Sequence, residues 1–316
     1  MTEVFSKSFT QQEPIPDEGI EAALAVLRHG RLHRYNLAPG EAGETALLEE
    51  EFAAFTGARY CLAVASGGYA LATALRALEV GPGTKVLANA FTLAPVPGAV
   101  ASVGGEVVLV EITDDLVIDI DDLATKAKAT GARVLMLSHM RGHVCDMDRL
   151  MAACRDLGVT VIEDCAHTMG AFWDGVPSGR HGAIGCYSTQ TYKHLNAGEG
   201  GLIVSDDARL MAKMILLSGS YMLYARPRAA PPPEAFEGVR MTTPNISGRM
   251  DNLRAAILRP QLRELGERRD RWNALYRAME DGLRATPALR LIDRPAAETY
   301  VGSSFQFLLP DWPAEA

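Results

Sequence analysis

The sequence is poor in several features that would each indicate a particular class of protein. Its 316 residues contain no basic tract, and the formal net charge is −8, which disfavours nucleic acid or an anionic membrane as a partner. No apolar run has the length needed to span a bilayer. The first residues lack the charged and apolar regions of a secretion signal. We therefore expect a cytoplasmic protein that binds neither membrane nor nucleic acid.

Cysteine is scarce, and the cysteines that are present show no paired spacing. None belongs to a CxxC motif, and all lie among apolar or small residues (Cys61, Cys145, Cys154, Cys165 and Cys186). This pattern is typical of buried free thiols in a reducing compartment. His139, His143 and Cys145 could be metal ligands, but no HExxH or CxxC spacing accompanies them, so we expect no metal site. A GxSxG motif, the mark of many serine hydrolases, is also absent.

The chain does contain a regular alternation of short apolar strands and helical patterns. The predicted strands are residues 61–65, 85–88, 106–111, 133–138, 159–163 and 202–205. The predicted helices are residues 20–27, 44–55, 69–78, 93–103, 121–130 and 148–157. Such alternation predicts an α/β fold with a mostly parallel sheet covered by helices. In sheets of this kind, ligands bind outside the carboxyl ends of the strands.

The last part of the chain differs in character. The proline-rich run 226–233 cannot be regular helix or central strand, and we interpret it as a linker or lid. Two helical patterns follow, at 250–265 and 268–283, and then two strand-like runs, at 289–292 and 304–309. We therefore expect a large domain at residues 1–245, including an N-terminal arm. A small α+β domain would follow at residues 246–316.

One lysine, Lys193, lies between a run of hydroxyl-bearing residues and a glycine-rich turn. Tyrosine, serine and threonine are frequent at residues 187–192, and Gly198-Glu199-Gly200-Gly201 follows the lysine. A lysine on a rigid loop among hydroxyl donors could form a Schiff base with an aldehyde cofactor that carries a phosphate. The alternative is a surface lysine beside a glycine turn.

Two other strand exits carry candidate ligands. Ser66-Gly67-Gly68 joins a strand to a helix, where free N–H groups could hold a phosphate, although glycine could equally serve packing there. Asp164 ends the strand at 159–163 and could keep the ring nitrogen of a cofactor protonated, or could cap a helix. His167, one helical turn later, could bind a ring substituent or be structural.

Together these motifs resemble the DegT/DnrJ/EryC1/StrS family of pyridoxal-phosphate-dependent aminotransferases. The likeness runs from about residue 16 to about residue 265, and its motifs are the runs 75–83, 97–100, 138–142 with 145–148, 163–167, 185–188, 193–201, and 249–250 with 255–257. The resemblance implies a three-layer fold of type I, the aspartate aminotransferase fold, with pyridoxal 5'-phosphate as cofactor. It also implies transfer of an amino group from an amino acid, such as glutamate or glutamine, to a carbonyl of a sugar, cyclitol or related small molecule.

The resemblance further implies roles for single residues. Lys193 would form the internal aldimine and carry the proton, Asp164 would pair with the pyridine nitrogen, and His167 would lie beside the ring hydroxyl. The other cofactor contacts would come from Ser66, Gly67, Gly68, Ser188, Phe91 and Asn245. Substrate contacts would come from Arg34, Tyr35 and Arg249. Since the family is dimeric, we expect a homodimer with shared active sites.

The sequence also departs from the family pattern. Leu93 replaces the second aromatic residue of a Phe-Thr-Phe/Trp run, so Phe91 is the candidate to stack on the cofactor ring. Ser247 stands where asparagine is usual, and Tyr192 where threonine is common. The region after residue 250 is shorter than the family's C-terminal domain, so we expect an incomplete small domain.

Two alternative functions stay open on the sequence. One is a dehydratase or lyase of the same fold, in which histidine commonly replaces the lysine, and His194 stands beside Lys193. The other is a non-catalytic regulatory homologue, because fold alone does not guarantee activity.

Overall fold

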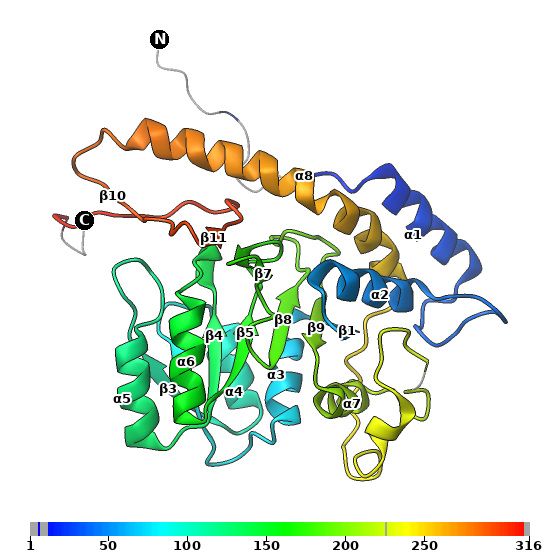
Figure 1. The fold of residues 1–316 in the computed structure, drawn as a ribbon. Coiled ribbons are helices and arrows are strands. Elements are labelled where there is room, and N and C mark those ends of the chain that lie inside the picture. The colour runs from blue at the N-terminus through cyan, green and yellow to red at the C-terminus, as the bar shows by residue number, and fades with distance from the viewer. Residues whose placement is uncertain (1–5, 7–11, 225, 313–316) are drawn as a thin grey trace.

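A mostly parallel sheet forms the centre of the computed structural model, which describes residues 6, 12–224 and 226–312 (Figure 1). Within these residues the sheet has seven strands in the order β1-β9-β8-β5-β4-β2-β3. The strands are β1 (Tyr60–Val64), β2 (Lys85–Asn89), β3 (Glu106–Val110), β4 (Val134–Ser138), β5 (Thr160–Asp164), β8 (Ile184–Ser188) and β9 (Gly201–Ser205). β9 runs antiparallel to both of its neighbours, and the run from β8 to β3 is parallel. This sheet confirms the predicted fold class.

Helices cover both faces of the sheet, as Figure 1 shows. They are α1 (Asp17–His29), α2 (Glu44–Thr56), α3 (Gly67–Ala77), α4 (Pro95–Ser102), α5 (Ile120–Thr130), α6 (Met147–Leu157), α7 (Ala208–Leu217) and α8 (Asn252–Leu283), with the short 3₁₀ helices η1 (Met140–Gly142) and η2 (Pro233–Phe236). Val134 and Met136 pack into the core with α3, α4 and α7. Leu135 and Leu137, which alternate with them along β4, pack into the core with α5 and α6. Both faces of β4 are therefore apolar, as a doubly covered sheet requires.

Two small sheets lie outside the central one. β11 (Glu298–Thr299) pairs with β6 (Phe172–Trp173), which in turn pairs with β7 (Val176–Pro177). β10 (Arg290–Leu291) pairs with β12 (Phe307–Leu308). The β11–β6 pairing attaches the end of the chain to a loop of the large sheet. The domain boundary expected near residue 245 stays a prediction.

One long helix replaces the two that the sequence predicts between residues 250 and 283. α8 continues through Pro260 and Gly266, and the prediction of two separate helices was wrong. Glycine costs only about 1 kcal/mol in a helix, and tertiary packing overrides this preference. Here Leu258, Leu262 and Leu265 are buried in the core beside α2, so packing holds the helix together on both sides of the proline.

The proline-rich run packs against the large sheet. The Cys61 N–H donates to Ala229 O at 3.1 Å, and Phe236, just beyond the run, is 1% exposed and stacks on Tyr224 with ring centroids 4.6 Å apart. These contacts place this part of the chain within the core around α7. The run is thus packed on the fold over part of its length, and its interpretation as a linker or lid stays a prediction.

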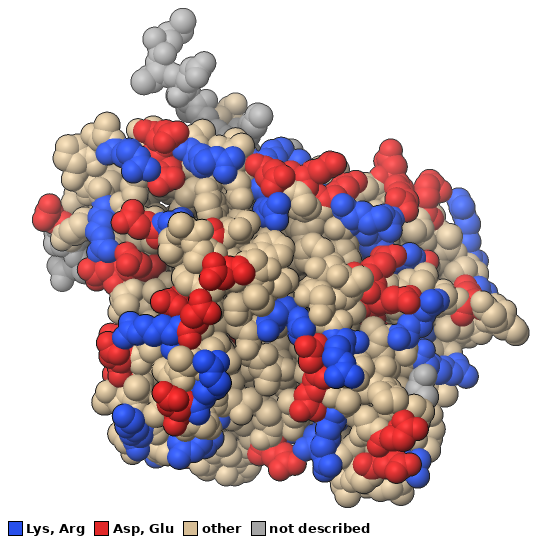
Figure 2. Space-filling view, viewed as in Figure 1, with Lys and Arg blue, Asp and Glu red and all other residues tan. Residues whose placement is uncertain are grey.

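Other expectations can be checked against the described residues. All five cysteines are buried free thiols, as predicted. Within the described part of the chain, no helix has both the length and the apolar character to cross a membrane. Basic and acidic side chains alternate over the face drawn in Figure 2.

Candidate active site

The loop that follows β8 holds Lys193 in a fixed conformation. Its two ends are joined where the Thr189 N–H donates to Gly200 O at 2.9 Å. Asn196 is tied to α8, because its N–H donates to Gln261 Oε1 at 2.9 Å and its carbonyl accepts from Gln261 Nε2 at 2.8 Å. A β carbon at Gly200 would collide with Thr189 Oγ1, so the glycine permits the close return of the loop.

Lys193 and His167 form the polar centre of the site. Lys193 Nζ lies 2.8 Å from His167 Nε2. Burial lowers the pKa of Lys193, and the nearby Asp164 carboxylate opposes this effect. Burial, with the charge of Lys193, lowers the pKa of His167 to about 3, so its ring is neutral near pH 7. A lysine with a lowered pKa beside a neutral imidazole has more of the uncharged amine that acts as a nucleophile.

Asp164 ends β5 deep in the protein but keeps some surface open to the recess beside Lys193. Ser138 Oγ donates to Asp164 Oδ2 at 3.0 Å, and the Ala166 N–H donates to Oδ1 at 3.2 Å. Burial raises the pKa of this carboxyl group, and these two hydrogen bonds lower it in part. A buried carboxylate that accepts only two hydrogen bonds is stabilised further by a cationic partner, such as a protonated ring nitrogen.

Ser138 was not among the predicted site residues. It ends β4, and the sheet register places it directly opposite Asp164 on β5. The strand-exit rule that selected Asp164 could have selected Ser138 as well, but the pairing of β4 with β5 was needed to put the two side chains together.

A cradle of backbone N–H groups lies where α3 begins. Ser66 caps the helix by accepting from the Tyr69 N–H at 3.1 Å. The first N–H groups of a helix have no helical partner, and they attract anions. A β carbon at Gly67 would lie 2.8 Å from Ser188 Cβ, whereas one at Gly68 would meet nothing within 4 Å. Gly67 thus lets the end of β8 approach the helix. The Ser188 hydroxyl therefore lies beside the first N–H groups of α3 and lines the same recess.

These parts surround one recess. It brings together the predicted residues Lys193, Asp164, His167, Gly67, Gly68 and Ser188. Its apolar walls come from Leu71, Leu93, Val96 and Met140. Phe91 does not line it within the described chain, whereas Leu93, two residues later, does. The prediction that Phe91 stacks on a cofactor ring therefore gains no support from this subunit alone.

Arg34 and Tyr35 do not line the recess of their own chain. Arg34 is 4% exposed, and its Nη2 pairs with Glu49 Oε2 at 2.7 Å. Glu49 also accepts from the Ala63 N–H at 2.7 Å, so the ion pair attaches residue 34 to β1. Tyr35 is buried, and its ring centroid lies 5.1 Å from Arg34 Cζ. The pairing with Glu49 was not foreseen, because Arg34 lies in a turn and Glu49 is 15 residues away on α2.

Asn245 and Arg249 also lie outside the recess. Arg249 donates to Gly219 O and, at 2.9 Å, to Ser247 Oγ, and its Cζ lies 5.0 Å above the Tyr221 ring centroid. Asn245 is exposed beside the same Gly219. Their predicted contacts with a partner's site stay predictions.

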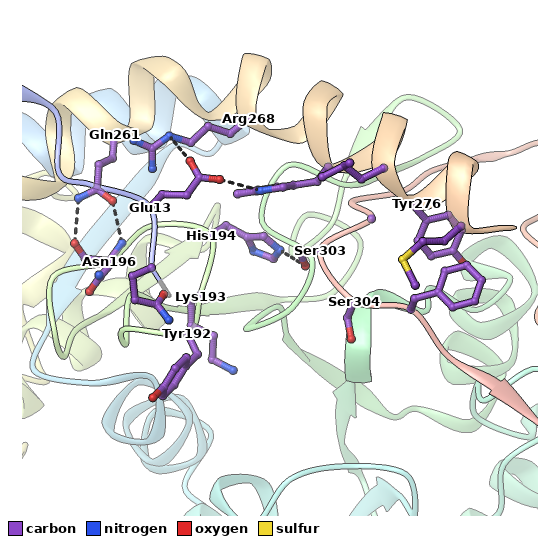
Figure 3. A pocket seen from close by; sticks show the side chains of 16 residues that line it. Glu13, Tyr192, Lys193, His194, Asn196, Gln261, Arg268, Tyr276, Ser303 and Ser304 are labelled. Atoms are coloured by element: carbon purple, nitrogen blue, oxygen red, sulfur yellow. Dashed lines mark hydrogen bonds and ion pairs between the residues drawn. The ribbon is translucent and has the colours of Figure 1, made fainter. Parts of the chain in front are cut away.

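A larger cavity of about 430 Å³ adjoins Lys193 on the side of α8 (Figure 3). His194 Nε2 lies 2.9 Å from Ser303 Oγ there, and its ring centroid is 5.5 Å from that of Trp272. Figure 3 shows Lys193 and His194 leaving the loop in different directions. Asp164, Ser188 and Gly67 do not border this cavity, so the chemistry of Lys193 belongs to the recess.

A second polar cluster lies beneath the recess. His139, Glu163 and Cys165 have ligand-type atoms within 4.8 Å of one another. The Glu163 carboxylate, however, accepts from the N–H groups of Gly179, His181 and Gly182 at 2.8, 2.8 and 2.6 Å, and lies 3.1 Å from His139 Nε2. Burial raises the pKa of the Cys165 thiol well above its usual value. This cluster therefore serves the fold, with a saturated carboxylate and a neutral thiol. His143 is also occupied, with Nε2 2.9 Å from Gln306 Oε1.

Comparison with known proteins identifies relatives of the chain. It is 34% identical over 241 residues to 3-amino-5-hydroxybenzoate synthase of Amycolatopsis mediterranei, covering 75% of this chain and 60% of that protein. It is 33% identical over 267 residues to L-glutamine:2-deoxy-scyllo-inosose aminotransferase of Streptoalloteichus tenebrarius, covering 84% and 61%. The chain therefore spans less than two thirds of the length of these relatives.

Solved structures share the fold. DesV of S. venezuelae, crystallised in complex with a ketimine intermediate, is 28% identical with a TM-score of 0.79, covering 94% of this chain and 77% of that one. The profile of the DegT/DnrJ/EryC1/StrS aminotransferase family matches residues 16–310, which confirms the resemblance. The chain therefore belongs to the DegT/DnrJ/EryC1/StrS aminotransferase family.

Proposed function

We propose that this protein is a pyridoxal-phosphate-dependent aminotransferase. It would move an amino group from an amino acid, with glutamate or glutamine as donor, to a carbonyl of a sugar, cyclitol or related small molecule. The observation that carries the proposal is the 2.8 Å contact of Lys193 Nζ with His167, in a recess that also holds Asp164 and the start of α3. The relatives named above support the substrate class.

The residues of the recess fit the cofactor. The first N–H groups of α3 and the Ser188 hydroxyl would hold its phosphate, at the point where only glycine fits at position 67. Asp164 would pair with the ring nitrogen, and Leu93 would contact the ring from the side of α4. When bound, pyridoxal phosphate supplies an aldehyde and a ring that withdraws electrons from the reacting carbon.

The protein's own groups then perform positioning and proton transfer. The Lys193 amine, with a pKa lowered by burial, is the nucleophile and later the group that accepts and returns a proton. His167 orients this amine while remaining neutral. Asp164 would supply the negative charge that pairs with the ring nitrogen, and the Ser138 hydroxyl holds that carboxylate in place.

The orientation of His194 argues against the lyase alternative. In the dehydratases of this fold a histidine takes the place of the lysine, but here His194 faces Ser303 and Trp272 on the other side of the loop. Lys193 alone of the two borders the recess. An aminotransferase releases a 2-oxo acid when given an amino donor without an acceptor, and a dehydratase does not.

We further propose a cytoplasmic homodimer with shared active sites. The free buried cysteines fit a reducing compartment. Predicted contacts of Arg249 and Asn245 with a partner subunit fit their position outside their own recess.

The direct test is covalent labelling. The protein is loaded with pyridoxal phosphate, reduced with borohydride and digested, and the peptide masses are measured. We expect the cofactor mass on the peptide that contains Lys193, no label in Lys193→Ala, and normal labelling in the exposed control Lys128→Ala. Stoichiometric 2-oxoglutarate from L-glutamate should accompany labelling. An unlabelled wild-type protein would refute the proposal, and labelling without 2-oxo acid from any of a broad panel of amino donors would favour a lyase or a non-catalytic homologue.

A further inference from the structure

We propose that Arg141 binds a carboxylate of the substrate at the mouth of the recess. This inference rests on the proposed function, because it names the substrate group that the Lys193 site recognises.

The backbone at Arg141 has an unusual conformation. Its φ of 55° and ψ of 19° lie in the left-handed region, which costs a non-glycine residue about 1–3 kcal/mol. Such strain persists only where the surroundings impose it, and it concentrates at ligand-binding sites. A glycine at position 141 would adopt this conformation without cost, so the arginine at this position lowers the stability of the fold.

The turn that carries Arg141 is fixed from behind. Gly142 O accepts from Arg294 Nη1 at 2.7 Å, and a β carbon at Gly142 would lie 3.3 Å from both His167 O and Val301 O. On the other side, Met140 lines the recess. Arg141 therefore lies on a rigid turn. Its neighbour Met140 lines the recess, and its other neighbour, Gly142, packs on the backbone of His167.

The guanidinium group has no counter-ion in the described chain. Arg141 is exposed, and it makes no hydrogen bond or ion pair with any described residue. Its charge acts on the site nonetheless, because, in addition to burial, it lowers the pKa of both Lys193 and His167. Arg141 does not itself line the recess, but it follows Met140, which does, and its unpaired charge acts on the reactive lysine in a protein of net charge −8.

Carboxylate is the anion that this arrangement favours. Every amino-acid donor carries a carboxylate on the carbon whose amino group reacts, and that carbon must come to Lys193. The planar guanidinium group binds a carboxylate through two parallel hydrogen bonds. The carboxylate could belong to the donor or to an acidic acceptor, and the experiment below separates these sources.

The first experiment measures binding without reaction. Glutarate, which has carboxylates but no amino group, is titrated by calorimetry into the cofactor-loaded protein and into the cofactor-free protein. We expect Arg141→Gln to weaken glutarate binding roughly tenfold to a hundredfold, as loss of a charge-assisted pair does. Arg141→Lys should retain part of the affinity. Arg155→Gln, at an exposed arginine on α6, is the matched control and should bind like the wild type.

The second experiment controls for folding and identifies the source of the carboxylate. Arg141→Gly should melt at or above the wild-type temperature while losing glutarate affinity, which separates binding from folding. If Arg141 binds the donor, Arg141→Gln raises the KM for L-glutamate with neutral acceptors as well. If it binds the acceptor, KM rises only for acceptors that carry a carboxylate.

The outcomes separate this inference from the proposed function. Equal glutarate affinity in wild type and Arg141→Gln, or no measurable binding by the wild type, would overturn the role of Arg141 even when Lys193 is labelled. An unlabelled Lys193 combined with Arg141-dependent glutarate binding would overturn the aminotransferase and leave the carboxylate site.

Discussion

Glu163 and Asp164 are neighbours on β5, yet the protein treats their carboxyl groups in opposite ways. Glu163 has no exposed surface and accepts three backbone N–H groups in addition to its contact with His139. Although burial raises its pKa, the hydrogen bond from His139 and those from the backbone leave the pKa below the usual value. Asp164 accepts two hydrogen bonds, borders the recess, and has a pKa that burial raises.

The difference separates a structural charge from a functional one. A saturated carboxylate stabilises the segment that donates to it, here residues 179–182, and has no capacity left for a ligand. A buried carboxylate with unused acceptor sites lowers stability. Such a group is typical of sites where a ligand supplies the missing positive charge. Successive residues of a strand point to opposite faces, so β5 serves both purposes with adjacent residues.

The largest effect on stability should come from Glu163→Gln. The substitution removes the charge and turns an amide N–H₂ toward backbone donors, so we expect a loss of about 3–5 kcal/mol in the free energy of unfolding. Urea denaturation at neutral pH measures this loss. Glu106→Gln, at an exposed glutamate of β3, is the control and should change stability little.

The same pair of variants has a defined pH dependence. Since the folded-state pKa of Glu163 lies below its usual value of 4.5, its contribution is complete above that value and is lost as the pH falls through the folded-state pKa. The difference between wild type and Glu163→Gln should therefore shrink on acidification. A difference that stays constant would mean that Glu163 is not held as a buried carboxylate.

Asp164→Asn should have the opposite profile. We expect turnover with L-glutamate to fall about 10²- to 10³-fold, as when an electrostatic partner of a reacting group is removed. The cofactor-free variant should unfold at the same urea concentration as the wild type or at a higher one, because a costly buried charge is gone. Asp156→Asn, exposed on α6, is the control for both measurements. A large loss of stability without loss of turnover would reverse the assignment of the two carboxylates.

Ser138→Ala should give a smaller effect of the same kind. It deletes the hydroxyl that donates to Asp164 Oδ2, a bond worth about 1.5 kcal/mol or more to a charged acceptor. We expect kcat/KM to fall about tenfold and its acid limb to move to higher pH, since the pKa of Asp164 rises further. Ser102→Ala, whose hydroxyl donates to Ala99 O on α4, tests for a general effect of losing a hydroxyl. An unchanged pH profile would show that Ser138 does not act through Asp164.

The smallest effect on stability and labelling should come from substitution of His194. His194 and its neighbour Lys193 form a second pair of adjacent residues whose side chains face opposite ways. His194→Asn deletes the contact with Ser303, which is worth about 1 kcal/mol to folding, and should leave covalent labelling of Lys193 intact. Thermal unfolding and the labelling assay measure the two outcomes. Loss of labelling in a folded variant would mean that His194 takes part in the chemistry.

Much of the fold was predictable because its signals are local. β1 to β5 and β9 match the predicted strands within one residue at each end, since short apolar runs between turns carry that pattern. β8 and α7 were not predicted, because the sequence of β8, Ile-Gly-Cys-Tyr-Ser, is not a continuous apolar run and α7 follows a loop without a clear boundary. The continuity of α8 through Gly266 was also missed, as packing against α2 outweighs a local break signal.

The sequence by itself determined six of the seven strands of the central sheet, the glycines at 67, 198, 200 and 201, and the strand-exit positions of Asp164 and Lys193, because apolar periodicity and turn chemistry act over a few residues. Tertiary structure alone decided which groups meet. It paired Ser138 with Asp164 across the sheet and withdrew Arg34 into an ion pair with Glu49. It also turned Leu93, and not Phe91, toward the recess. These choices depend on the register and packing of distant segments, which no local pattern encodes.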